Sequence, residues 1–445
     1  MNFEQPIENY TIDCVSDTLK LVQIVQRHGD RTPTNFYPND PYKNPSIWPD
    51  GIGELTRNGK QRMFDFGRAL RNRYNGYLND SHSPRDVYIA SSPSSRCLES
   101  AQCFMTGLYQ PKDFWIWKNN SEVAKNWQPI AVYTGADGLL STSAVCPKAD
   151  RLWTNFMQTK EVVNYVNNNK EFIKTLETKT GDKYLSAKPS TLRPLEFLST
   201  TLRVETENGL ELPDWADNQT LTKLRDLEIH AFYFDWKDPQ IQRLRAGLLL
   251  KEITKNMLNR ADQVVNGTVN DKLKKLYIYE THDVMQVVFM QALGVYDSPH
   301  VNHTPPKYGA SLVWELHQIG KDFVVKLLYF NDIKFNDMNP VSVELNLTKC
   351  NANSDCNLIN FIKSVDPFIP INWQQECELP CNYDTVTVSS GSMGAPFYTM
   401  STICLILLAI VLTTFILYKR QQLWSQCCCC GLSLDMPYKR RYNPL

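Results

Sequence analysis

The chain has 445 residues, of which 42% are hydrophobic, and its 47 basic side chains balance 47 acidic ones. A chain of this length can bury a sizeable core, and it predicts more than one domain or one large domain with an insertion. The formal net charge of zero gives no electrostatic attraction for nucleic acid, so a nucleic-acid partner is not expected.

The first predicted element is a strand in LVQIVQRHGDRTP, residues 21–33. Its apolar run from Leu21 to Val25 is too continuous for a strand with one face in water, so we expect both faces to be buried, as in parallel sheets. The strand ends in the charged sequence RHGDR. So much charge directly after a buried strand indicates a functional site rather than a solvated surface.

Two later segments repeat this pattern of a buried strand, a polar turn and a helix. Residues 87–90 form one predicted strand, which the turn SSPSS and a helix with Arg96 at its start follow. Residues 276–279 form another, before a helix from about 284 to 293. Strand ends in α/β sheets form ligand sites and helix N-termini favour anions, so we expect these junctions to build one anion site. The residues that it would gather are Arg27, His28, Arg31, Arg96, His282 and Asp283.

Taken singly, these residues have structural explanations. Arg96 alone could be a solvated surface group, and Asp283 could cap the helix that follows it. The cluster RHGDR is much harder to explain in that way, so the functional reading of the whole set is preferred.

Between the second and third junctions the alternation of strand and helix fades. Residues 150–181 and 239–258 have the periodicity of amphipathic helices, which predicts a mainly helical insertion. A hairpin is expected at 311–318 and 323–332. The predicted organisation is an α/β catalytic domain at 15–114 and 251–380, the insertion at 115–250, a polar stalk at 381–396, a transmembrane helix at 397–418 and a cytoplasmic tail at 419–445.

The transmembrane segment is predicted from length and charge. Residues 397–418 carry no charged side chain and, at ~1.5 Å of rise per residue, are long enough to cross ~30 Å of hydrocarbon. A buried core helix is the alternative, which the length and the absence of charge disfavour. Basic residues such as Lys419 and Arg420 follow, so the positive-inside rule predicts a single-pass type I protein with residues 1–396 lumenal or extracellular.

Both ends of the chain bear on targeting. The first residues contain no apolar segment of the kind that forms a signal peptide. Either the sequence begins after processing, or it is incomplete, or the membrane segment itself directs targeting. In the tail, the run Cys427 to Cys430 is typical of S-palmitoylation, and Tyr442 to Leu445 matches a Tyr-x-x-apolar sorting signal. The lysosome or endosome and the cell surface both stay open as destinations.

Eight cysteines precede the membrane segment and would face an oxidising compartment, where they can pair. None has the spacing of a zinc site, so no metal is expected. Seven asparagines open N-x-S/T triplets and are candidate N-glycosylation sites, which agrees with a lumenal location. They are Asn9, Asn79, Asn119, Asn218, Asn266, Asn302 and Asn346.

Several segments together resemble the histidine acid phosphatase family, which includes prostatic and lysosomal acid phosphatases and membrane-anchored members. They are RHGDRTP at 27–33, GELTRNGKQRMFDFGRALRNRY at 53–74, SSPSSRCLESA at 91–101, WQPI at 127–130, THD at 281–283 and INWQQEC at 371–377. The resemblance covers about residues 18 to 380, and the combination is highly specific.

The resemblance implies an α/β fold, similar to phosphoglycerate mutase, with a mixed, mostly parallel sheet flanked by helices and an inserted helical domain. It implies that His28 attacks phosphorus to form a phosphohistidine and that Asp283 protonates the leaving oxygen. The residues that would hold the phosphate oxygens are Arg27, Arg31, Arg96 and His282. Such an enzyme hydrolyses phosphate monoesters of small molecules or proteins without a cofactor, and acidic pH would favour a protonated Asp283.

The resemblance also implies disulfides and a partner. The implied pairs are Cys146–Cys377 and Cys350–Cys356. We expect Cys97 and Cys103 to stay reduced as core residues, and Cys14 could pair with Cys381. Trp127 lies near a dimer contact of the family, which implies a homodimer, although Tyr133 stands where the family commonly has a histidine.

Two other classes of function stay open. One is another phosphatase of the wider superfamily that shares the RHG motif, specific for inositol phosphates or lysophosphatidate. The other is a receptor-like ectodomain with a vestigial site, which the presence of all six site residues disfavours.

Overall fold

The computed structural model describes residues 17–135, 138–268, 272–347, 350 and 356–380. The predicted stalk, membrane segment and tail lie outside these residues. Within them, no helix has the length and apolar character needed to cross a membrane.

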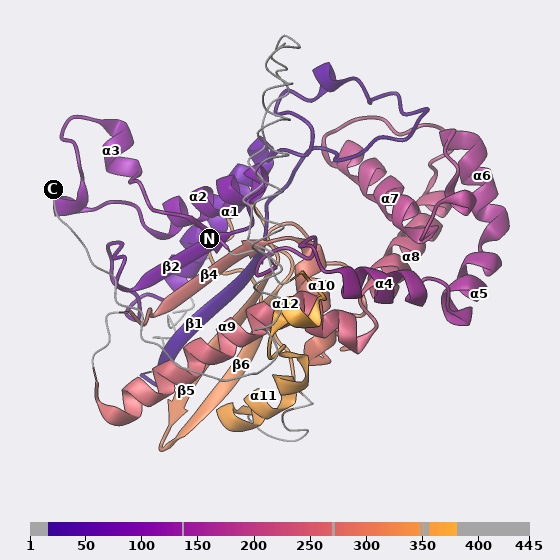
Figure 1. Ribbon diagram of the computed structural model, residues 1–445. Helices are drawn as coiled ribbons and strands as arrows, with labels where there is room; N and C mark the ends of the chain where they lie inside the picture. The colour runs from indigo at the N-terminus through magenta and orange to yellow at the C-terminus, as the bar shows by residue number, and fades with distance from the viewer. Residues whose placement is uncertain (1–16, 136–137, 269–271, 348–349, 351–355, 381–445) are drawn as a thin grey trace, which may run out of the picture. The chain divides into compact units, whose positions relative to one another are not determined.

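The described strands form one sheet in the order β3-β2-β4-β1-β5-β6-β7, with β8 paired to β6 (Figure 1). Their bounds are β1 Leu19–Arg27, β2 Val87–Ser91, β3 Tyr133–Thr134, β4 Leu276–Thr281, β5 Ser311–Ile319, β6 Asp322–Phe330, β7 Val343–Glu344 and β8 Cys356–Asn357. The strands β3, β2, β4 and β1 run parallel, whereas β5 to β8 pair antiparallel. The expectation of a mostly parallel sheet was therefore wrong, because the predicted hairpin pairs directly with β1 and makes that half of the sheet antiparallel.

Helices cover both faces of the sheet, as the continuous apolar run in β1 predicted. Val22 and Ile24 belong to the core under helices α1 and α2, and Leu21 and Val25 belong to the core on the opposite face. The helices on the first face are α1 Arg57–Arg73 and α2 Ser95–Leu108, and those on the second are α9 Pro239–Asn266, α10 Asp283–Leu293 and α11 Leu358–Val365. Thr56 caps α1, because its hydroxyl accepts a hydrogen bond from the Gly59 N–H at 3.1 Å.

A second group of helices lies beside the sheet and has an apolar core of its own (Figure 1). It consists of α4 Pro147–Phe156, α5 Lys160–Asn168, α6 Lys170–Thr180, α7 Leu192–Glu207 and α8 Asn218–Asp235. Leucines of α7 and α8, such as Leu195 and Leu224, fill this core. The boundary predicted at residue 250 falls inside α9, whose apolar residues join the core of the sheet.

Short elements complete the fold. They are the helices α3 Glu122–Asn126 and α12 Trp373–Glu376 and the 3-10 turns Pro45–Ile47, Asp113–Trp115, Tyr184–Ser186 and Asp366–Phe368.

The structure contains both implied disulfides, Cys146–Cys377 and Cys350–Cys356, with S–S distances of 2.04 and 2.10 Å. Cys97 and Cys103 are free thiols, as expected. Cys14 and Cys381 lie outside the described residues. Among the candidate glycosylation sites Asn9 lies outside them too, and the other six asparagines are exposed.

Candidate active site

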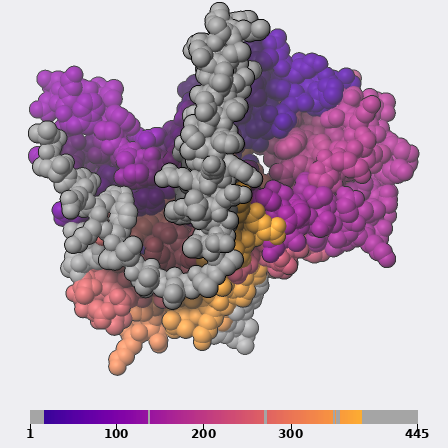
Figure 2. Space-filling model, in the orientation of Figure 1, coloured from indigo at the N-terminus to yellow at the C-terminus, as the bar shows by residue number. Residues whose placement is uncertain are grey.

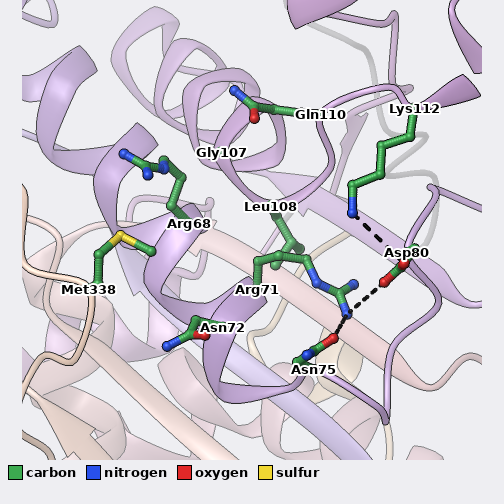
Figure 3. Close-up of a pocket in the computed structure, with 10 residues that line it drawn as sticks. All are labelled: Arg68, Arg71, Asn72, Asn75, Asp80, Gly107, Leu108, Gln110, Lys112 and Met338. Atoms are coloured by element: carbon green, nitrogen blue, oxygen red, sulfur yellow. Dashed lines mark hydrogen bonds and ion pairs between the residues drawn. The ribbon is translucent and has the colours of Figure 1, made fainter.

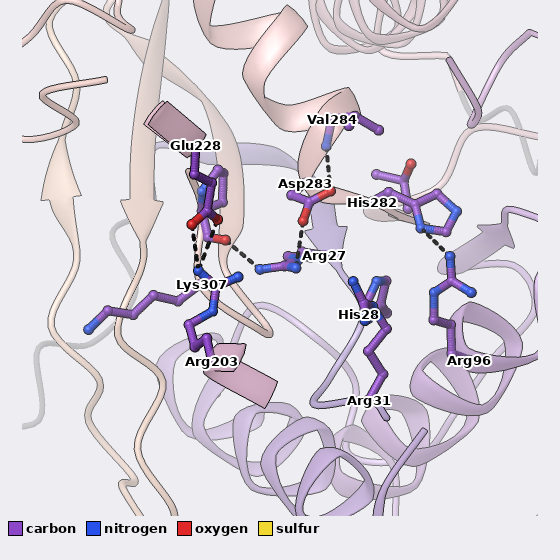
Figure 4. Close-up of polar contacts among 12 residues, drawn as sticks. Arg27, His28, Arg31, Arg96, Arg203, Glu228, His282, Asp283, Val284 and Lys307 are labelled. Carbon is purple, nitrogen blue, oxygen red and sulfur yellow. Dashed lines mark hydrogen bonds and ion pairs between the residues drawn. The ribbon is translucent and has the colours of Figure 1, made fainter. Parts of the chain in front are cut away.

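The three predicted junctions meet at one edge of the sheet, because β4 lies between β1 and β2. The backbone N–H of His28 donates to the Thr281 carbonyl at the end of β4, at 3.1 Å. The N–H of Ser92, directly after β2, donates to the Glu280 carbonyl at 2.9 Å. The six predicted residues thus come together around one space (Figure 4).

Position 29 requires glycine because the backbone of Gly59 lies against it, and not because its own backbone is left-handed. A Cβ on Gly29 would lie 2.6 Å from the Gly59 carbonyl oxygen, and a Cβ on Gly59 would lie 2.2 Å from that of Asp30. The loop after β1 therefore packs its backbone directly on the start of α1. Asp30 strengthens this contact, because both of its oxygens accept from Arg62 of α1, at 2.6 and 2.9 Å.

His28 is buried and held in one orientation. Its Nδ1 lies 2.8 Å from the Gly29 carbonyl oxygen, which can only accept, so Nδ1 carries the proton. Burial lowers the pKa of His28 well below 6.5, and the positive charges of the three arginines, with any charge on His282, act in the same direction. The imidazole is therefore neutral even in acid, and its Nε2, for which no hydrogen bond to the described residues is found, keeps a free lone pair.

His282 is also neutral and oriented. Its Nδ1 lies 3.4 Å from Nη2 of Arg96, which can only donate, so Nδ1 accepts. Nε2 then donates to the Ser92 hydroxyl at 2.9 Å. Burial and the Arg96 charge lower the pKa of His282 to about 4. Its ring lies 5.4 Å from that of His28.

Asp283 and Arg27 form an ion pair of 2.5 Å at the start of α10. Asp283 also accepts from the Val284 N–H at 2.8 Å, so it contributes to the helix start as the capping alternative proposed. Burial raises the pKa of Asp283, but the Arg27 and Arg31 charges outweigh it and hold that pKa below 3.8. Asp283 is therefore ionised in the free site except in stronger acid, which leaves the expectation that acidic pH favours its protonated form unchanged.

Arg31 and Arg96 differ from Arg27 in that neither has a carboxylate within ion-pair distance among the described residues. Arg31 donates only to the Thr32 carbonyl, at 3.0 Å. Arg96 makes one further contact, a long one of 3.4 Å to the Gly53 carbonyl. Two guanidinium groups therefore stand at the site without a neutralising partner, which is what a phosphate site requires.

Two residues of the site were not predicted. Tyr308 lies under the Arg27 guanidinium, 4.3 Å from ring centroid to Cζ, and 5.9 Å from the His28 ring. Ser92 orients His282, as described above. Ser92 belongs to the turn that sequence reasoning placed at the site, so its position was a usable signal. No local sequence pattern around Tyr308 indicates that it belongs to the site.

A pocket of about 320 Å³ lies at the other ends of α1 and α2, away from this site (Figure 3). Its cations are largely satisfied: Arg71 and Lys112 both face Asp80, at 3.9 and 3.8 Å. We therefore assign the chemistry to the edge of the sheet and not to this pocket.

Comparison with known proteins agrees with this geometry. Residues 18–330 match the family model of the histidine phosphatase superfamily, branch 2. The chain belongs to this superfamily. It is 31% identical to lysosomal acid phosphatase of Homo sapiens over 413 residues, which cover 91% of this chain and 89% of that protein. It is 33% identical to prostatic acid phosphatase of Rattus norvegicus over 368 residues, 81% of this chain and 89% of that protein.

Solved structures show the same fold at low sequence identity. The phytase from Citrobacter braakii has a TM-score of 0.58 and 18% identity, over 81% of this chain and 98% of that one. A Hafnia alvei phytase in complex with myo-inositol hexakis sulphate has a TM-score of 0.57 and 17% identity, over 82% of this chain and 99% of that one. At such identities the likeness concerns the fold alone.

Proposed function

We propose that the protein is an acid phosphatase that hydrolyses phosphate monoesters through a phosphohistidine on His28. The observation that carries the proposal is the state of His28: its Nδ1 proton is held by the Gly29 carbonyl, and its pKa is lowered by burial. A neutral imidazole in a ring of arginines is a nucleophile that remains available in acid, where most histidines are protonated.

In the first step, the phosphate group binds to Arg27, Arg31 and Arg96, and His282 donates its Nε2 proton to a phosphate oxygen in place of the Ser92 hydroxyl. His28 Nε2 forms a bond to phosphorus while the bond from phosphorus to the leaving oxygen breaks. The guanidinium groups stabilise the charge that spreads over the other phosphate oxygens. Arg31 and Arg96 contribute most directly, since neither first has to give up a carboxylate.

Asp283 supplies the proton that the leaving oxygen needs. The free site holds Asp283 ionised through Arg27, at 2.5 Å. A bound phosphate adds negative charge beside Asp283 and competes with it for Arg27, and both effects raise the pKa of Asp283. The substrate therefore brings the acid to its working state, and low pH favours the same proton uptake.

In the second step, water attacks phosphorus and its proton passes to the Asp283 carboxylate. The bond from Nε2 to phosphorus breaks, inorganic phosphate leaves and His28 returns to its neutral form. Every charge in this cycle is balanced by side chains of the site, so the proposal calls for no cofactor or metal.

The test is trapping of the intermediate together with a matched histidine control. His28→Ala should lose p-nitrophenyl phosphate hydrolysis by a factor on the order of 10⁴ or more, because the whole reaction runs through this group. His300→Ala changes an exposed histidine and should have no effect. Acid-labile phosphate should appear on His28 of the wild type. Label on a serine or cysteine, or full activity of His28→Ala, would overturn the mechanism.

The alternatives receive less support. The solved phytases resemble this chain in fold, which does not argue for inositol phosphates as substrates. A receptor-like ectodomain does not need the proton arrangement of His28 and His282, nor two unpaired arginines beside them.

The domain organisation, membrane topology and cellular destination of the enzyme are part of the proposal. We propose an α/β catalytic domain with an inserted group of helices that ends before α9 rather than at residue 250, anchored through the helix at 397–418 with its catalytic part lumenal or extracellular. A lysosomal destination is supported by the names of the relatives. Glycosylation at the exposed asparagines follows from the same topology.

A homodimer is proposed from the surface around α3. Trp127 is 37% exposed and Trp117 53%, and the Trp117 indole N–H donates to the Trp127 carbonyl at 2.8 Å. The segment around α3 stands at the surface, in purple at the left of the space-filling view (Figure 2). Light scattering of the wild type and of Trp127→Ala tests this, and a monomeric wild type would exclude it.

A further inference from the structure

One face of helix α7 is turned toward the active site. Arg193, Glu196, Arg203 and Glu207 follow one another at intervals of three, seven and four residues, so they share this face. After Asp235, the charge of Asp283 contributes to raising the pKa of Arg193. Figure 4 shows Arg203 on the same side of the site as Arg27. We call these four residues the α7 face.

The arginines of the α7 face are neutralised. Arg193 forms an ion pair of 2.6 Å with Asp235, and Arg203 one of 2.9 Å with the buried Glu228. Lys307, which Figure 4 also draws on that side, is paired with Asp332 at 3.0 Å. A second phosphate on the leaving group would therefore find no unpaired cation among these residues.

Glu196 is different, because no hydrogen bond to its carboxyl is found among the described residues. The side chain is only partly exposed, and it lies close enough to Asp283 to be influenced by that charge. Arg193 acts on Glu196 through its charge but forms its hydrogen-bonded ion pair with Asp235, so the Glu196 carboxyl is suited to accept from a donor carried by the substrate.

We infer that Glu196 is a specificity-determining residue, which accepts a hydrogen bond from an ammonium group on the leaving alcohol, so that the enzyme favours phosphate monoesters of amino alcohols over bisphosphates. This inference rests on the proposed function. A hydrogen bond between charged groups typically contributes enough for about a tenfold preference.

The ionisation of Glu196 predicts a pH dependence of the substrate preference, which a purely structural role of this residue would not produce. Burial raises the pKa of Glu196 to about 8; the Arg193 charge opposes this shift, and the charges of Glu228, Asp283 and Asp235 add to it. In the free enzyme the carboxyl is therefore mostly neutral at pH 5 and becomes ionised toward pH 8. The attraction for an ammonium group should strengthen over that range, because only the carboxylate carries a charge.

The experiment compares O-phosphoethanolamine with ethyl phosphate, which differ in the ammonium group. The ratio of their kcat/KM values cancels the titration of the catalytic residues, and the same ratio in Glu196→Gln gives the intrinsic effect of the ammonium group on the phosphate and on the leaving alcohol. In the full-length wild type we expect the ratio, divided by that of Glu196→Gln, to rise with pH between 5 and 8 and to reach about ten. In Glu196→Gln the ratio should be several-fold lower at pH 8 and should keep only the pH dependence of the two phosphates themselves. Glu211→Gln, an exposed glutamate beyond α7, should behave as the wild type.

Hydrolysis of p-nitrophenyl phosphate, which has no ammonium group, separates the possible failures. Glu196→Gln should retain that activity, which also shows that the variant folds. An equal ratio and pH profile in wild type and Glu196→Gln would overturn the inference. A clear preference of the wild type for propane-1,3-diol bisphosphate over propyl phosphate would also overturn it. If the wild type does not hydrolyse p-nitrophenyl phosphate at all, the proposed function itself fails.

Discussion

The edge of the sheet and the α7 face both carry arginines, but only the edge of the sheet has arginines without a carboxylate partner among the described residues. Arg31 and Arg96 have no carboxylate within ion-pair distance among the described residues, whereas Arg193 and Arg203 each have one, at 2.6 and 2.9 Å. Holding unpaired cations together is costly, and that cost is recovered when phosphate binds. The difference separates arginines that are placed to bind an anion from arginines that hold helices together.

The largest effect is expected from Asp283→Asn, which tests the acid at the edge of the sheet. Alkyl phosphates release a strongly basic alkoxide, whereas nitrophenyl phosphate releases a stabilised phenolate that needs little help. The variant should therefore slow alkyl phosphate hydrolysis by ~10²–10⁴-fold and nitrophenyl phosphate hydrolysis far less. Asparagine caps a helix about as well as aspartate, so a mere cap would leave both rates unchanged. Equal rates for wild type and variant on an alkyl phosphate would reduce Asp283 to that role.

A pair of arginine variants contrasts the two surfaces directly. Arg31→Met should lower kcat/KM for every phosphomonoester by about 10²–10³-fold, as the loss of one preorganised donor does, with little effect on stability. Arg203→Met should do the reverse, because it leaves the buried Glu228 with Arg225 as its single remaining cation, at 2.8 Å. The breaking of a buried pair typically costs ~3–5 kcal/mol, and the partial exposure of Arg203 places this case at the lower end.

Urea titrations and steady-state kinetics of both variants measure this contrast. If Arg203→Met loses activity on all substrates while it unfolds at the wild-type urea concentration, the α7 face takes part in phosphate binding, and the distinction between the two surfaces is wrong.

The two surfaces also differ in how well sequence predicts them. All six residues at the edge of the sheet were predicted, since each lies at the end of a buried strand, in the loop after it or at the start of the next helix, and strand ends meet by the rules of α/β folds. The α7 face was not predicted, because helical periodicity indicates that a helix exists but not which distant surface its polar side meets. The antiparallel half of the sheet was missed for a related reason: a hairpin can be recognised locally, but its pairing with β1 is a long-range choice.

The roles of the residues within the predicted site could also be predicted only in part from the sequence. Gly29 was expected to allow a tight turn, whereas the structure requires it because Gly59 of α1 lies against it. That contact joins two segments whose packing no local pattern records. The ionised state of Asp283 depends on the geometry of Arg27 in the same way.

A smaller effect is expected from the disulfide Cys146–Cys377, which ties α4 to the segment after α12 over a separation of 231 residues. Cys146→Ala together with Cys377→Ala should lower the free energy of unfolding by ~2–4 kcal/mol. Since the bridge lies in a small core with Ala149 and Leu244 that contains none of the six site residues, kcat/KM at low temperature should be unchanged. Non-reducing peptide mapping that finds both thiols free in the wild type would contradict the bridge itself.

The smallest effect is expected from pH. It acts through two buried carboxyl groups that join the loop between β1 and α1 to helix α7. Asp40, in the segment between β1 and α1, and Glu205 of α7 are 2% and 0% exposed. Burial and the neighbouring Asp40 raise the pKa of Glu205 to about 8. The Lys43 charge acts on Asp40, but the Lys43 ammonium donates to the Pro38 carbonyl, at 2.5 Å. Asp40 and Glu205 therefore share a proton and stay together only while one of them is neutral.

The sign of the effect on stability follows from these pKa values. An unfolded glutamate loses its proton near pH 4.5, whereas the folded Glu205 keeps it until about pH 8. Between these values the folded state binds more protons, so the free energy of unfolding is largest in acid and falls as pH rises, by about 1 kcal/mol for each pH unit. Glu205→Gln cannot titrate and should flatten this slope, which urea titrations from pH 5 to 8 measure. If the slope of Glu205→Gln equals that of the wild type, Asp40 and Glu205 do not link α7 to the edge of the sheet in a pH-dependent way. A flattened slope would show that acid strengthens the contact between α7 and the loop after β1.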